Sequence, residues 1–202
     1  LHFEIKSITQ PANASYILTV GKEKIKCQSL VVATGGLSIP KMGATPFGYK
    51  LAEQFGVNVQ ATRAGLVPFT LQLAEKEKFA ALSGLALPCT VSNVRQSFTE
   101  NLLFTHRGLS GPVVLQMSSY WHEGEAININ LLPATDLQQA LLGAQKDKTK
   151  VKLKNYLPQF FAKRLISLFI ADDLLECSLL DLSHKQIQFI AEQFHHWQVK
   201  PN

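Results

Sequence analysis

Apolar residues in the first third of the chain fall in short runs that turn-forming residues separate. Residues 1–33 hold three such runs, with turn sequences at Pro11-Ala12-Asn13 and at Gly21-Lys22. Short β-prone runs bounded by Pro, Asn and Gly predict a β-meander. The continuous apolar run at residues 30–33 predicts a strand that is buried on both faces of a parallel sheet, and this strand ends at Thr34.

The next predicted element is a helix over residues 46–55. Thr45 can cap its N-terminus, Pro46 suits the first helical position, and Gly56 suits the left-handed residue that ends a helix. The apolar residues of this segment fall on one helical face: Phe47, Leu51, Ala52 and Phe55. We expect a strand to follow over residues 57–60.

From Gly65 onward the pattern changes to that of antiparallel strands. A short helix is expected after Gly111 and Pro112, because Pro suits the first position of a helix. Alternating and β-branched runs bounded by turn residues predict the strands. We expect these strands at residues 66–73, 85–94, 98–105 and 126–131.

The last third of the chain has the periodicity of helices. Pro158 is placed to open one helix, with apolar residues at Phe161, Leu165, Leu168 and Phe169. Ser183 and Gln186 fit a capping box for a final helix, whose apolar face ends at Trp197. The elements together predict an α+β fold. In this fold a meander, a strand and a helix precede an antiparallel, β-barrel-like sheet with helices.

The composition is that of a globular protein, with 46% apolar and 17% charged residues among 202. A net charge of +5 is mildly basic and short of a dedicated nucleic-acid binder, so we expect no nucleic-acid partner. The widely spaced Cys27, Cys89 and Cys177 favour a reducing compartment over a disulfide framework or a zinc site. No apolar stretch reaches the ~18 residues of a membrane span and no signal peptide is recognisable, so we expect a cytoplasmic protein without membrane contact.

The end of the predicted strand at residues 30–33 is the most informative position in the chain. A buried strand that stops at Gly35 and Gly36 lets the backbone approach a ligand across its carboxyl end, where ligands bind in open α/β sheets. The alternative is a tight turn that contacts no ligand. Thr-Gly-Gly alone favours this alternative, and only the surrounding sequence shifts the interpretation toward a ligand site.

Three segments together resemble the YhiN/BaiN-like family of bacterial NAD(P)/FAD-dependent oxidoreductases. They are LVVATGGLSIPKMGAT at residues 30–45, GLVPF at residues 65–69 and LLFTHRGLSGP at residues 102–112. The segments follow the family's order at compatible spacing, so the resemblance covers essentially the whole chain. The meander that leads into Ala-Thr-Gly is also similar to the second FAD-contacting motif of glutathione-reductase-type flavoproteins. Asn101 stands where the family usually has Gly, and Asn is the next best residue for a left-handed turn.

The resemblance implies an FAD-dependent oxidoreductase that transfers hydride between NAD(P)H, the flavin and a small-molecule substrate. It places the FAD contacts of this chain at Ala33, Thr34, Gly35 and Gly36. The G-x-G-x-x-G turn that holds the FAD pyrophosphate is missing, because no two glycines here are separated by a single residue. We therefore expect the chain to be the middle portion of a longer polypeptide, whose N- and C-terminal portions complete the flavin site.

The resemblance also implies a domain organisation. Residues 1–65 would be part of the FAD-binding domain, and residues 66–202 would form a domain inserted into it. The inserted domain would have a β-barrel-like part at residues 66–132 and a helical part at residues 133–202. Because an insertion leaves the two ends of the host loop close together, the beginning and the end of the inserted part should lie side by side.

The turn at residues 105–112 supplies the remaining candidate site residues. The resemblance implies that His106 is a catalytic acid or base near the flavin and that Arg107 holds an anionic substrate group or a nicotinamide phosphate. Ser110 would present its backbone N–H where a helix begins, a position that favours anions. The alternative is a structural cap and turn, in which His106 is hydrogen-bonded to the backbone.

Two further patterns carry charge or imidazole groups. Lysines alternate with other residues over nine positions and could hold an anionic partner or a phosphate: Lys146, Lys148, Lys150, Lys152 and Lys154. The pattern is more typical of a solvated surface or a protected sheet edge. His195 and His196 lack a carboxylate or cysteine at ligand spacing, so we assign no metal and expect a contact with the C-terminus of their helix.

A second hypothesis treats the barrel-like part and its lysines as a stand-alone binding module for an anionic polymer or a protein partner. The missing phosphate-binding turn is the one feature in its favour. A G-x-G-x-x-G motif upstream of Leu1 in the full reading frame would decide for the flavoenzyme.

Overall fold

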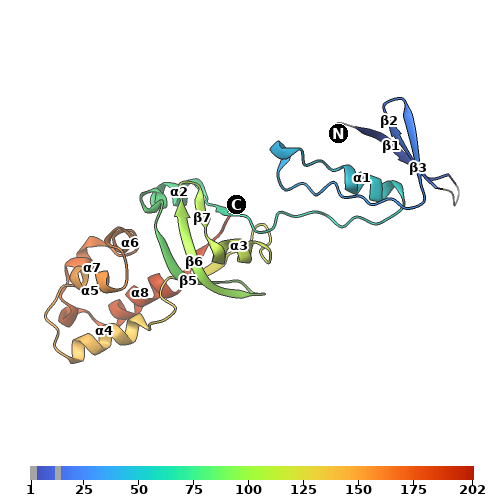
Figure 1. The fold of residues 1–202 in the computed structure, drawn as a ribbon. Coiled ribbons are helices and arrows are strands. Elements are labelled where there is room, and N and C mark those ends of the chain that lie inside the picture. The colour runs from blue at the N-terminus through green and yellow to red at the C-terminus, as the bar shows by residue number, and fades with distance from the viewer. Residues whose placement is uncertain (1–3, 12–14) are drawn as a thin grey trace. The chain divides into compact units, whose positions relative to one another are not determined.

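The computed structural model describes residues 4–11 and 15–202, so the predicted turn residues Ala12 and Asn13 lie outside the described part. The chain divides into two compact units, Leu1–Arg63 and Ala64–Asn202. Each unit has a hydrophobic core of its own. Figure 1 shows the course of the chain through the elements of both units.

The first unit contains the predicted meander. Its strands β1 (Ile5–Thr9), β2 (Tyr16–Val20) and β3 (Glu23–Cys27) form an antiparallel sheet in the order β1-β2-β3. Gly21 has a φ of +61° in the turn between β2 and β3, which glycine adopts without the steric cost of a Cβ. The meander is therefore confirmed in its described part.

Helix α1 (Phe47–Gln54) packs its apolar face against this sheet. Leu51 and the strand residue Ile8 belong to the small core of the first unit. The side-chain amide of Gln54 donates a 2.7 Å hydrogen bond to the carbonyl oxygen of Ile8. Gly56 follows with a φ of +74°, so the left-handed residue predicted after this helix is confirmed.

Residues 30–33 do not form the predicted buried strand. The segment has no strand pairing, and Val31 and Val32 are 86% and 45% exposed. A strand needs a hydrogen-bonded neighbour, and no parallel strand is present in the described part of the chain. The strand expected at residues 57–60 is absent as well, and Val57 is 57% exposed. Val31, Val32 and Val57 are therefore exposed, although the composition of both runs is that of buried strands.

The second unit is built on a six-stranded antiparallel sheet with the order β4-β7-β6-β5-β8-β9 (Figure 1). The predicted strands at 85–94, 98–105 and 126–131 are confirmed to within two residues at each end. With the helices described below, they confirm the α+β fold class. The strands are β4 (Phe69–Thr70), β5 (Ala86–Ser92), β6 (Ser97–Thr105), β7 (Gly108–Ser110), β8 (Ile127–Asn130) and β9 (Trp197–Val199).

This sheet curls into a partial barrel whose two edge strands come together. The backbone N–H of Asn202, just beyond β9, donates a 3.0 Å hydrogen bond to the carbonyl oxygen of Thr70 in β4. Strands β4 and β9 are the two edges of the sheet, so this bond joins edges that a flat sheet would leave apart. The beginning and the end of the second unit therefore lie side by side.

Two glycines allow β7 to lie close to the neighbouring backbone. A Cβ on Gly108 would lie 2.3 Å from the carbonyl oxygen of Phe69, and a Cβ on Gly111 would lie 2.5 Å from that of Asn101. Both distances are far below van der Waals contact, so only glycine fits at these positions. Helix α3 (Pro112–Ser118), which was expected after Pro112, starts directly after Gly111.

The predicted strand at 66–73 and the predicted end of the last helix are wrong. The strand shrinks to β4 because Leu66 takes a left-handed φ of +55° and Pro68 has no N–H to donate. Helix α2 (Leu73–Phe79) begins where that strand was expected to end. Trp197 lies on β9, since the last helix ends earlier and the chain turns to pair with β8.

Helices from the last third of the chain gather at one end of the sheet (Figure 1). The capping box predicted from Ser183 and Gln186 is confirmed at the start of the last helix. Helices and sheet share one core, in which the rings of Phe161 and Phe194 stack with centroids 4.2 Å apart. The helices are α4 (Leu137–Lys146), α5 (Leu153–Tyr156), α6 (Lys163–Phe169), α7 (Asp172–Glu176) and α8 (His184–His195).

Pro158 lies in a 3-10 helix (Leu157–Gln159), and the helix predicted to open there begins only at Lys163. Of the apolar face predicted for it, Phe161 and Leu165 are buried, at 5% and 1% exposure, and Leu168 and Phe169 are half-buried against the core. Within residues 4–11 and 15–202, no helix is both long and apolar enough to cross a membrane. Further 3-10 helices are Pro40–Met42, Ala80–Leu82 and Leu179–Asp181.

Candidate functional site

Residues 33–36, which were expected to contact FAD, form one exposed loop that passes close to α1. Tyr49 Oη would lie 3.1 Å from a Cβ on Gly36, and Thr34 Oγ1 would lie 3.2 Å from a Cβ on Gly48. Both distances are shorter than ordinary contact. The loop can therefore approach α1 because glycines stand at positions 36 and 48.

The backbone of this loop is open to a ligand. Among the residues that the structure describes, the N–H and C=O groups of residues 33–36 have no hydrogen-bond partner. Gly35 has a φ of +71° and open space where a Cβ would stand, and the neighbouring Val31 and Val32 are exposed and apolar. Free backbone groups beside apolar surface suit a ligand that combines a flat apolar ring with polar edges. A flavin has both features, so these residues fit the group, and the FAD contact stays a prediction.

His106 and Arg107 form the two-residue turn between β6 and β7. Thr105 pairs with Gly108 below the turn. Thr105 Oγ1 accepts hydrogen bonds from the N–H groups of Arg107 at 3.3 Å and Gly108 at 3.2 Å, which fixes the backbone of the turn. Both side chains at the apex are exposed, so the turn presents an imidazole and a guanidinium group to solvent.

Ser110 lies at the other end of β7, where it pairs with Leu103 of β6 and is half-buried. The structure therefore brings His106 and Arg107 together but does not place Ser110 in the same turn. The alternative role for His106, a ring hydrogen-bonded to the backbone, is not seen within the described residues. The functional roles of all three residues stay predictions.

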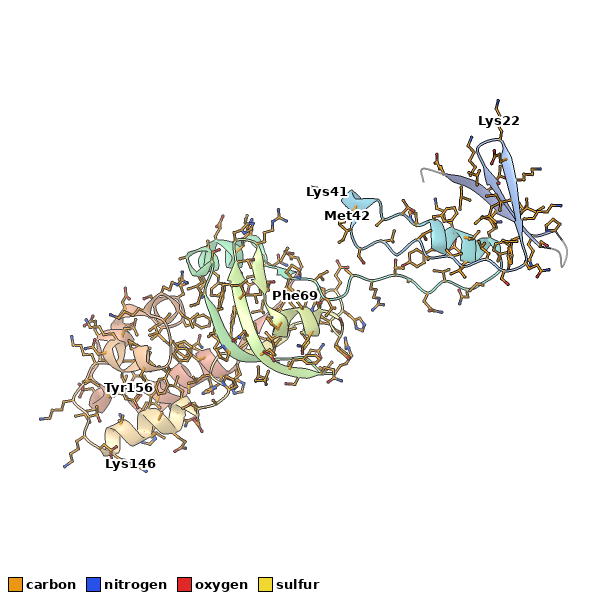
Figure 2. All side chains as sticks on the ribbon, in the orientation of Figure 1. Lys22, Lys41, Met42, Phe69, Lys146 and Tyr156 are labelled. Carbon is orange, nitrogen blue, oxygen red and sulfur yellow. The ribbon has the colours of Figure 1, made fainter. Side chains whose placement is uncertain are left out.

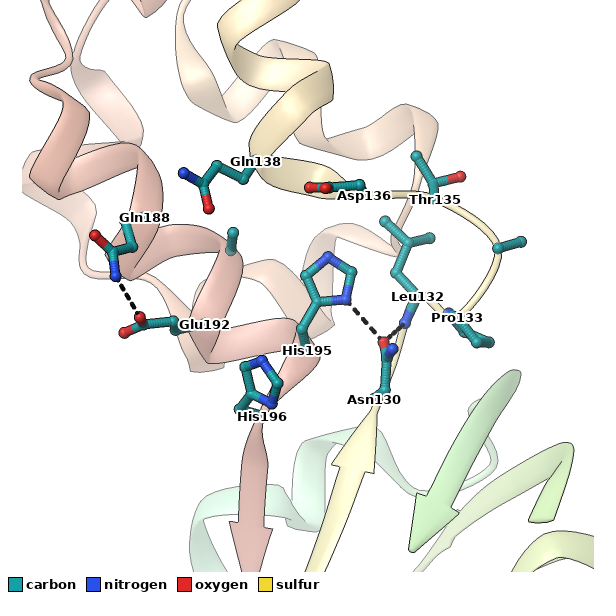
Figure 3. Close-up of a pocket in the computed structure, with 12 residues that line it drawn as sticks. Asn130, Leu132, Pro133, Thr135, Asp136, Gln138, Gln188, Glu192, His195 and His196 are labelled. Atoms are coloured by element: carbon teal, nitrogen blue, oxygen red, sulfur yellow. Dashed lines mark hydrogen bonds between the residues drawn. The ribbon is translucent and has the colours of Figure 1, made fainter. Parts of the chain in front are cut away.

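A pocket lies between α4, α8 and the loop after β8 (Figure 3). The sequence did not predict it. Its volume is about 480 Å³, and most of its lining residues are polar. The polar residues around it are Asn130, Thr135, Asp136, Gln138, Gln188, Glu192, His195 and His196. In the part of the chain that the structure describes, no three His, Cys, Asp or Glu side chains are arranged to hold a metal ion.

His195 connects the elements around this pocket (Figure 3). Its Nε2 accepts a 3.1 Å hydrogen bond from the N–H of Leu137, the first residue of α4. Because Nε2 accepts, Nδ1 carries the proton and donates to Asn130 Oδ1 at 2.9 Å. Asn130 Oδ1 also accepts the N–H of Leu132 at 2.9 Å. One imidazole therefore links α8, α4 and the end of β8.

Burial lowers the pKa of His195, the Asp136 carboxylate opposes this shift, and His196 adds to it. A neutral His195 ring agrees with the acceptor role of Nε2. His195 lies in the last turn of α8, as expected, but the hydrogen bond of its ring to the N-terminus of α4 was not predicted. The His pair is visible in the sequence, but Leu137 and Asn130 lie 58 and 65 residues away from His195, beyond any local pattern.

Comparison with known protein families identifies the family to which the second unit belongs. Residues 63–202 match a family described as "HI0933-like protein barrel and H2TH domain". The match coincides with the second unit, whose curled sheet agrees with the barrel in that description. The chain belongs to this HI0933-like family. Membership covers the barrel and the helices, and it includes the turn that carries His106 and Arg107.

Two relatives of this HI0933-like chain carry the printed name "Ribosomal RNA dihydrouridine synthase". The protein from Haemophilus influenzae is 40% identical over 202 residues, which cover 98% of this chain and 50% of the relative. The protein from Escherichia coli is 44% identical over 204 residues, which cover 100% of this chain and 51% of the relative. The chain therefore spans about half the length of these relatives, and the similarity runs through both of its units.

These names contradict the expected partners. Both relatives are named for ribosomal RNA, so the expectation of a small-molecule substrate and no nucleic-acid partner is wrong. The small-molecule substrate was implied by the resemblance, and the absence of a nucleic-acid partner was expected from the net charge of +5, which averages over the whole chain. Nucleic-acid contact depends on where positive charge is concentrated, and an average does not report a local concentration.

Proposed function

We propose that this chain is the central part of an FAD-dependent oxidoreductase that reduces uridine in ribosomal RNA to dihydrouridine, with NAD(P)H as the reductant. The similarity to two ribosomal RNA dihydrouridine synthases carries the proposal, because it extends over 98–100% of this chain. Ribosomal RNA is made in the cytoplasm of bacteria, which agrees with the expected localisation.

We assign the FAD contacts of this chain to Ala33, Thr34, Gly35 and Gly36. Their unpaired backbone groups support this assignment, as does the small distance between Gly36 and α1. The exposed Val31 and Val32 would be covered by the rest of the FAD-binding domain, to which residues 1–65 belong in this proposal. Residues 66–202 would be the inserted domain, and the bond between Asn202 and Thr70 supports this organisation because it brings the two ends of that domain together.

Reduction of uridine adds a hydride and a proton across the C5–C6 double bond of the base. A bound reduced flavin would supply the hydride, and NAD(P)H would return two electrons to the flavin. The proton needs an acid in the protein, and the exposed imidazole of His106 can supply it. Arg107, adjacent to it, can pair with an RNA phosphate or with the phosphate of the reductant.

The test uses the full-length protein and this chain in parallel. The full-length protein should purify with bound FAD and should form dihydrouridine when it is mixed with NAD(P)H and unmodified ribosomal RNA. The 202-residue chain alone should purify without flavin, because it has no G-x-G-x-x-G turn for the pyrophosphate. Stoichiometric flavin in the short chain would show that the cofactor site is misassigned. A flavin-loaded full-length protein that reduces no uridine would overturn the proposed reaction.

A further inference from the structure

Five lysines from the end of α4 to the start of α5 form a surface that the flavin chemistry does not use. The lysine strip consists of Lys146, Lys148, Lys150, Lys152 and Lys154, and all five are exposed. Figure 2 shows the first of them, Lys146, near the C-terminal end of α4. All five lysines lie within the second unit.

The turn that ends α4 determines the conformation of the first half of the lysine strip. The N–H of Lys148 bonds to the carbonyl of Gln145, and that of Thr149 bonds to the carbonyl of Ala144. This pair of bonds is the Schellman arrangement, which needs a left-handed residue at the position of Lys148. Lys148 has a φ of +53°, and it is one of two non-glycine residues with positive φ among those described. Glycine would fit here at lower cost, so the chain retains a cation where the backbone favours a residue without a side chain.

An extended segment around Lys152 determines the conformation of the second half of the lysine strip. Lys152 forms an antiparallel bridge with Ser178, and Leu153 and Leu179 complete the backbone pairing on either side. Val151 packs against the core and Leu153 is fully buried, so the alternate residues are the exposed lysines. Lys150 and Lys152 flank the extended residue Val151, so their backbones are roughly 6–7 Å apart, which is similar to the spacing of successive phosphates in an RNA strand. Lys154 follows in the first turn of α5.

The charge of the lysine strip is only partly compensated. Glu176 pairs with Lys152 at 2.7 Å and with Lys154 at 2.6 Å. These two ammonium groups hold the pKa of Glu176 down at about 2, so it stays ionised. Lys146, Lys148 and Lys150 have no ion pair among the described residues. Glu176 and Asp147, which lies within the run, offset two of the five lysines and leave an excess of three positive charges.

A polar groove of about 580 Å³ continues from the end of the lysine strip. Lys154 and Lys163 line it, and so do the neutral donors Asn155 and Ser167. The carboxylates of Asp172 and Glu176 also line it, which directs an anion toward the lysine strip rather than into the groove. The strip is therefore the part of this surface with an excess of positive charge.

We propose that the lysine strip binds RNA phosphates and holds the ribosomal RNA substrate while a uridine is reduced elsewhere on the protein. This inference rests on the proposed function. Five cations within nine residues suit a polymer with one charge per nucleotide better than a single phosphate. Ammonium groups supply point charges without base recognition, so the lysine strip contributes affinity and orientation, not choice of the uridine.

The test measures equilibrium binding of the 202-residue chain to a short fluorescein-labelled RNA hairpin at several salt concentrations. One variant changes Lys146, Lys148 and Lys150 to Gln. A matched control changes Lys22, Lys24 and Lys26 to Gln, which removes the same charge at the same spacing from exposed positions of the first unit. Lys22 is labelled at the tip of the β2–β3 hairpin in Figure 2.

The strip variant should bind the RNA hairpin roughly tenfold or more weakly than the unchanged chain, and its plot of log K against log salt should be shallower by roughly 2–3. The control should keep most of the affinity. Equal loss in both variants, no loss in the strip variant or no RNA binding by the unchanged chain would overturn the inference. Displacement of the RNA by poly-glutamate at equal charge would also overturn it in favour of an acidic protein partner.

A single substitution distinguishes the effect of charge on RNA affinity from an effect on folding. Lys148→Gly removes one cation and also relieves the left-handed strain, so the midpoint of urea unfolding should stay the same or rise. RNA affinity should fall, with a salt slope shallower by roughly 0.7–0.9. If affinity is unchanged while stability rises, Lys148 does not contact RNA. Uridine reduction by the full-length protein is measured separately, so a failed lysine strip and a failed enzyme proposal give different results.

Discussion

Asn202 donates its backbone N–H to the carbonyl oxygen of Thr70 at 3.0 Å and so joins the end of the second unit to its first strand. The same unit contains one continuous core that sheet and helices share. A body with its own core and adjacent ends can fold without the chain around it. The first unit has only a small core around Ile8, Leu18 and Leu51.

Residues 64–202 alone should therefore fold, whereas residues 1–63 alone should not. Urea unfolding of the 64–202 fragment should be a single cooperative transition, with coincident curves from circular dichroism and tryptophan fluorescence. The 1–63 fragment should show no cooperative transition, because a core this small does not offset the loss of chain entropy. A fragment 64–202 that unfolds gradually would contradict the independence of this unit.

Gly111→Ala should destabilise the second unit by about 3 kcal/mol or more, because the new Cβ would lie 2.5 Å from the carbonyl oxygen of Asn101. Gly124 is a matched control, since its φ of +88° is close to the +93° of Gly111 but no atom lies within 4 Å of a Cβ there. Gly124→Ala should cost only about 1 kcal/mol. If urea unfolding shows the same loss of stability in both variants, backbone conformation and not contact with Asn101 determines the cost of Gly111→Ala.

His195→Ala should lower the free energy of unfolding by about 1–3 kcal/mol, since it leaves the N–H of Leu137 and the oxygen of Asn130 without their partner. His196→Ala, at an exposed neighbour, should change it by less than about 0.5 kcal/mol. Similar losses in the two variants would remove the connecting role assigned to His195.

The pH dependence of stability should report the same residue. Folding lowers the pKa of His195, so the unfolded state binds the proton more readily than the folded state. The contribution of His195 is therefore present above its unfolded pKa of about 6.5 and is lost as pH falls toward the lower folded pKa. Stability should decline between about pH 7 and pH 5, and this decline should be smaller in His195→Ala. An unchanged pH profile in the variant would assign the decline to other groups.

In the full-length protein, Gly36→Val should lower the FAD content measured by absorbance after purification. Gly36 is not in a left-handed conformation, so the effect would come from the space that the side chain occupies. The new side chain would also meet Tyr49 Oη, which lies 3.1 Å from a Cβ on Gly36. The double variant Gly36→Val with Tyr49→Phe removes that hydroxyl and serves as the control. FAD loss should persist in the double variant, and full recovery there would make Gly36 a packing residue only.

His106→Ala in the full-length protein should slow dihydrouridine formation by roughly 10²–10⁴-fold while FAD content stays the same. The exposed His184 at the start of α8 provides the control, because His184→Ala removes an imidazole from another part of the same unit. The pH dependence of the rate should also change in this variant. Equal rates for the His106 variant and the unchanged protein across pH would restrict His106 to a role in the turn.

Local sequence signals predicted much of the fold. The capping residues Ser183 and Gln186, the left-handed Gly56 and the alternating strands of the second unit act within a few residues, so the sequence shows them directly. Residues 30–33 have the composition of a buried strand, but a strand forms only beside a partner, and none is present in the described part of the chain.

The candidate site residues also divide into those that local sequence predicts and those that depend on distant parts of the chain. The consecutive residues of the exposed glycine loop and the turn with His106 and Arg107 were identified from local motifs. The environment of His195 depends on Leu137 and Asn130, which only the folded chain brings to it. The lysine strip was recognised as a pattern, but its charge excess depends on its pairing with Glu176 across a bridge of the fold.

The most direct test of the central claim is the dihydrouridine content of ribosomal RNA in cells of the source organism. It can be measured by mass spectrometry in three strains: the parent, a strain without the gene that encodes this chain, and that strain with the gene restored. We predict that the dihydrouridine content of ribosomal RNA falls in the deletion strain, returns with the unchanged gene and does not return with the Gly36→Val variant. Equal dihydrouridine content in all three strains would contradict the assignment of this chain to an enzyme that reduces ribosomal RNA.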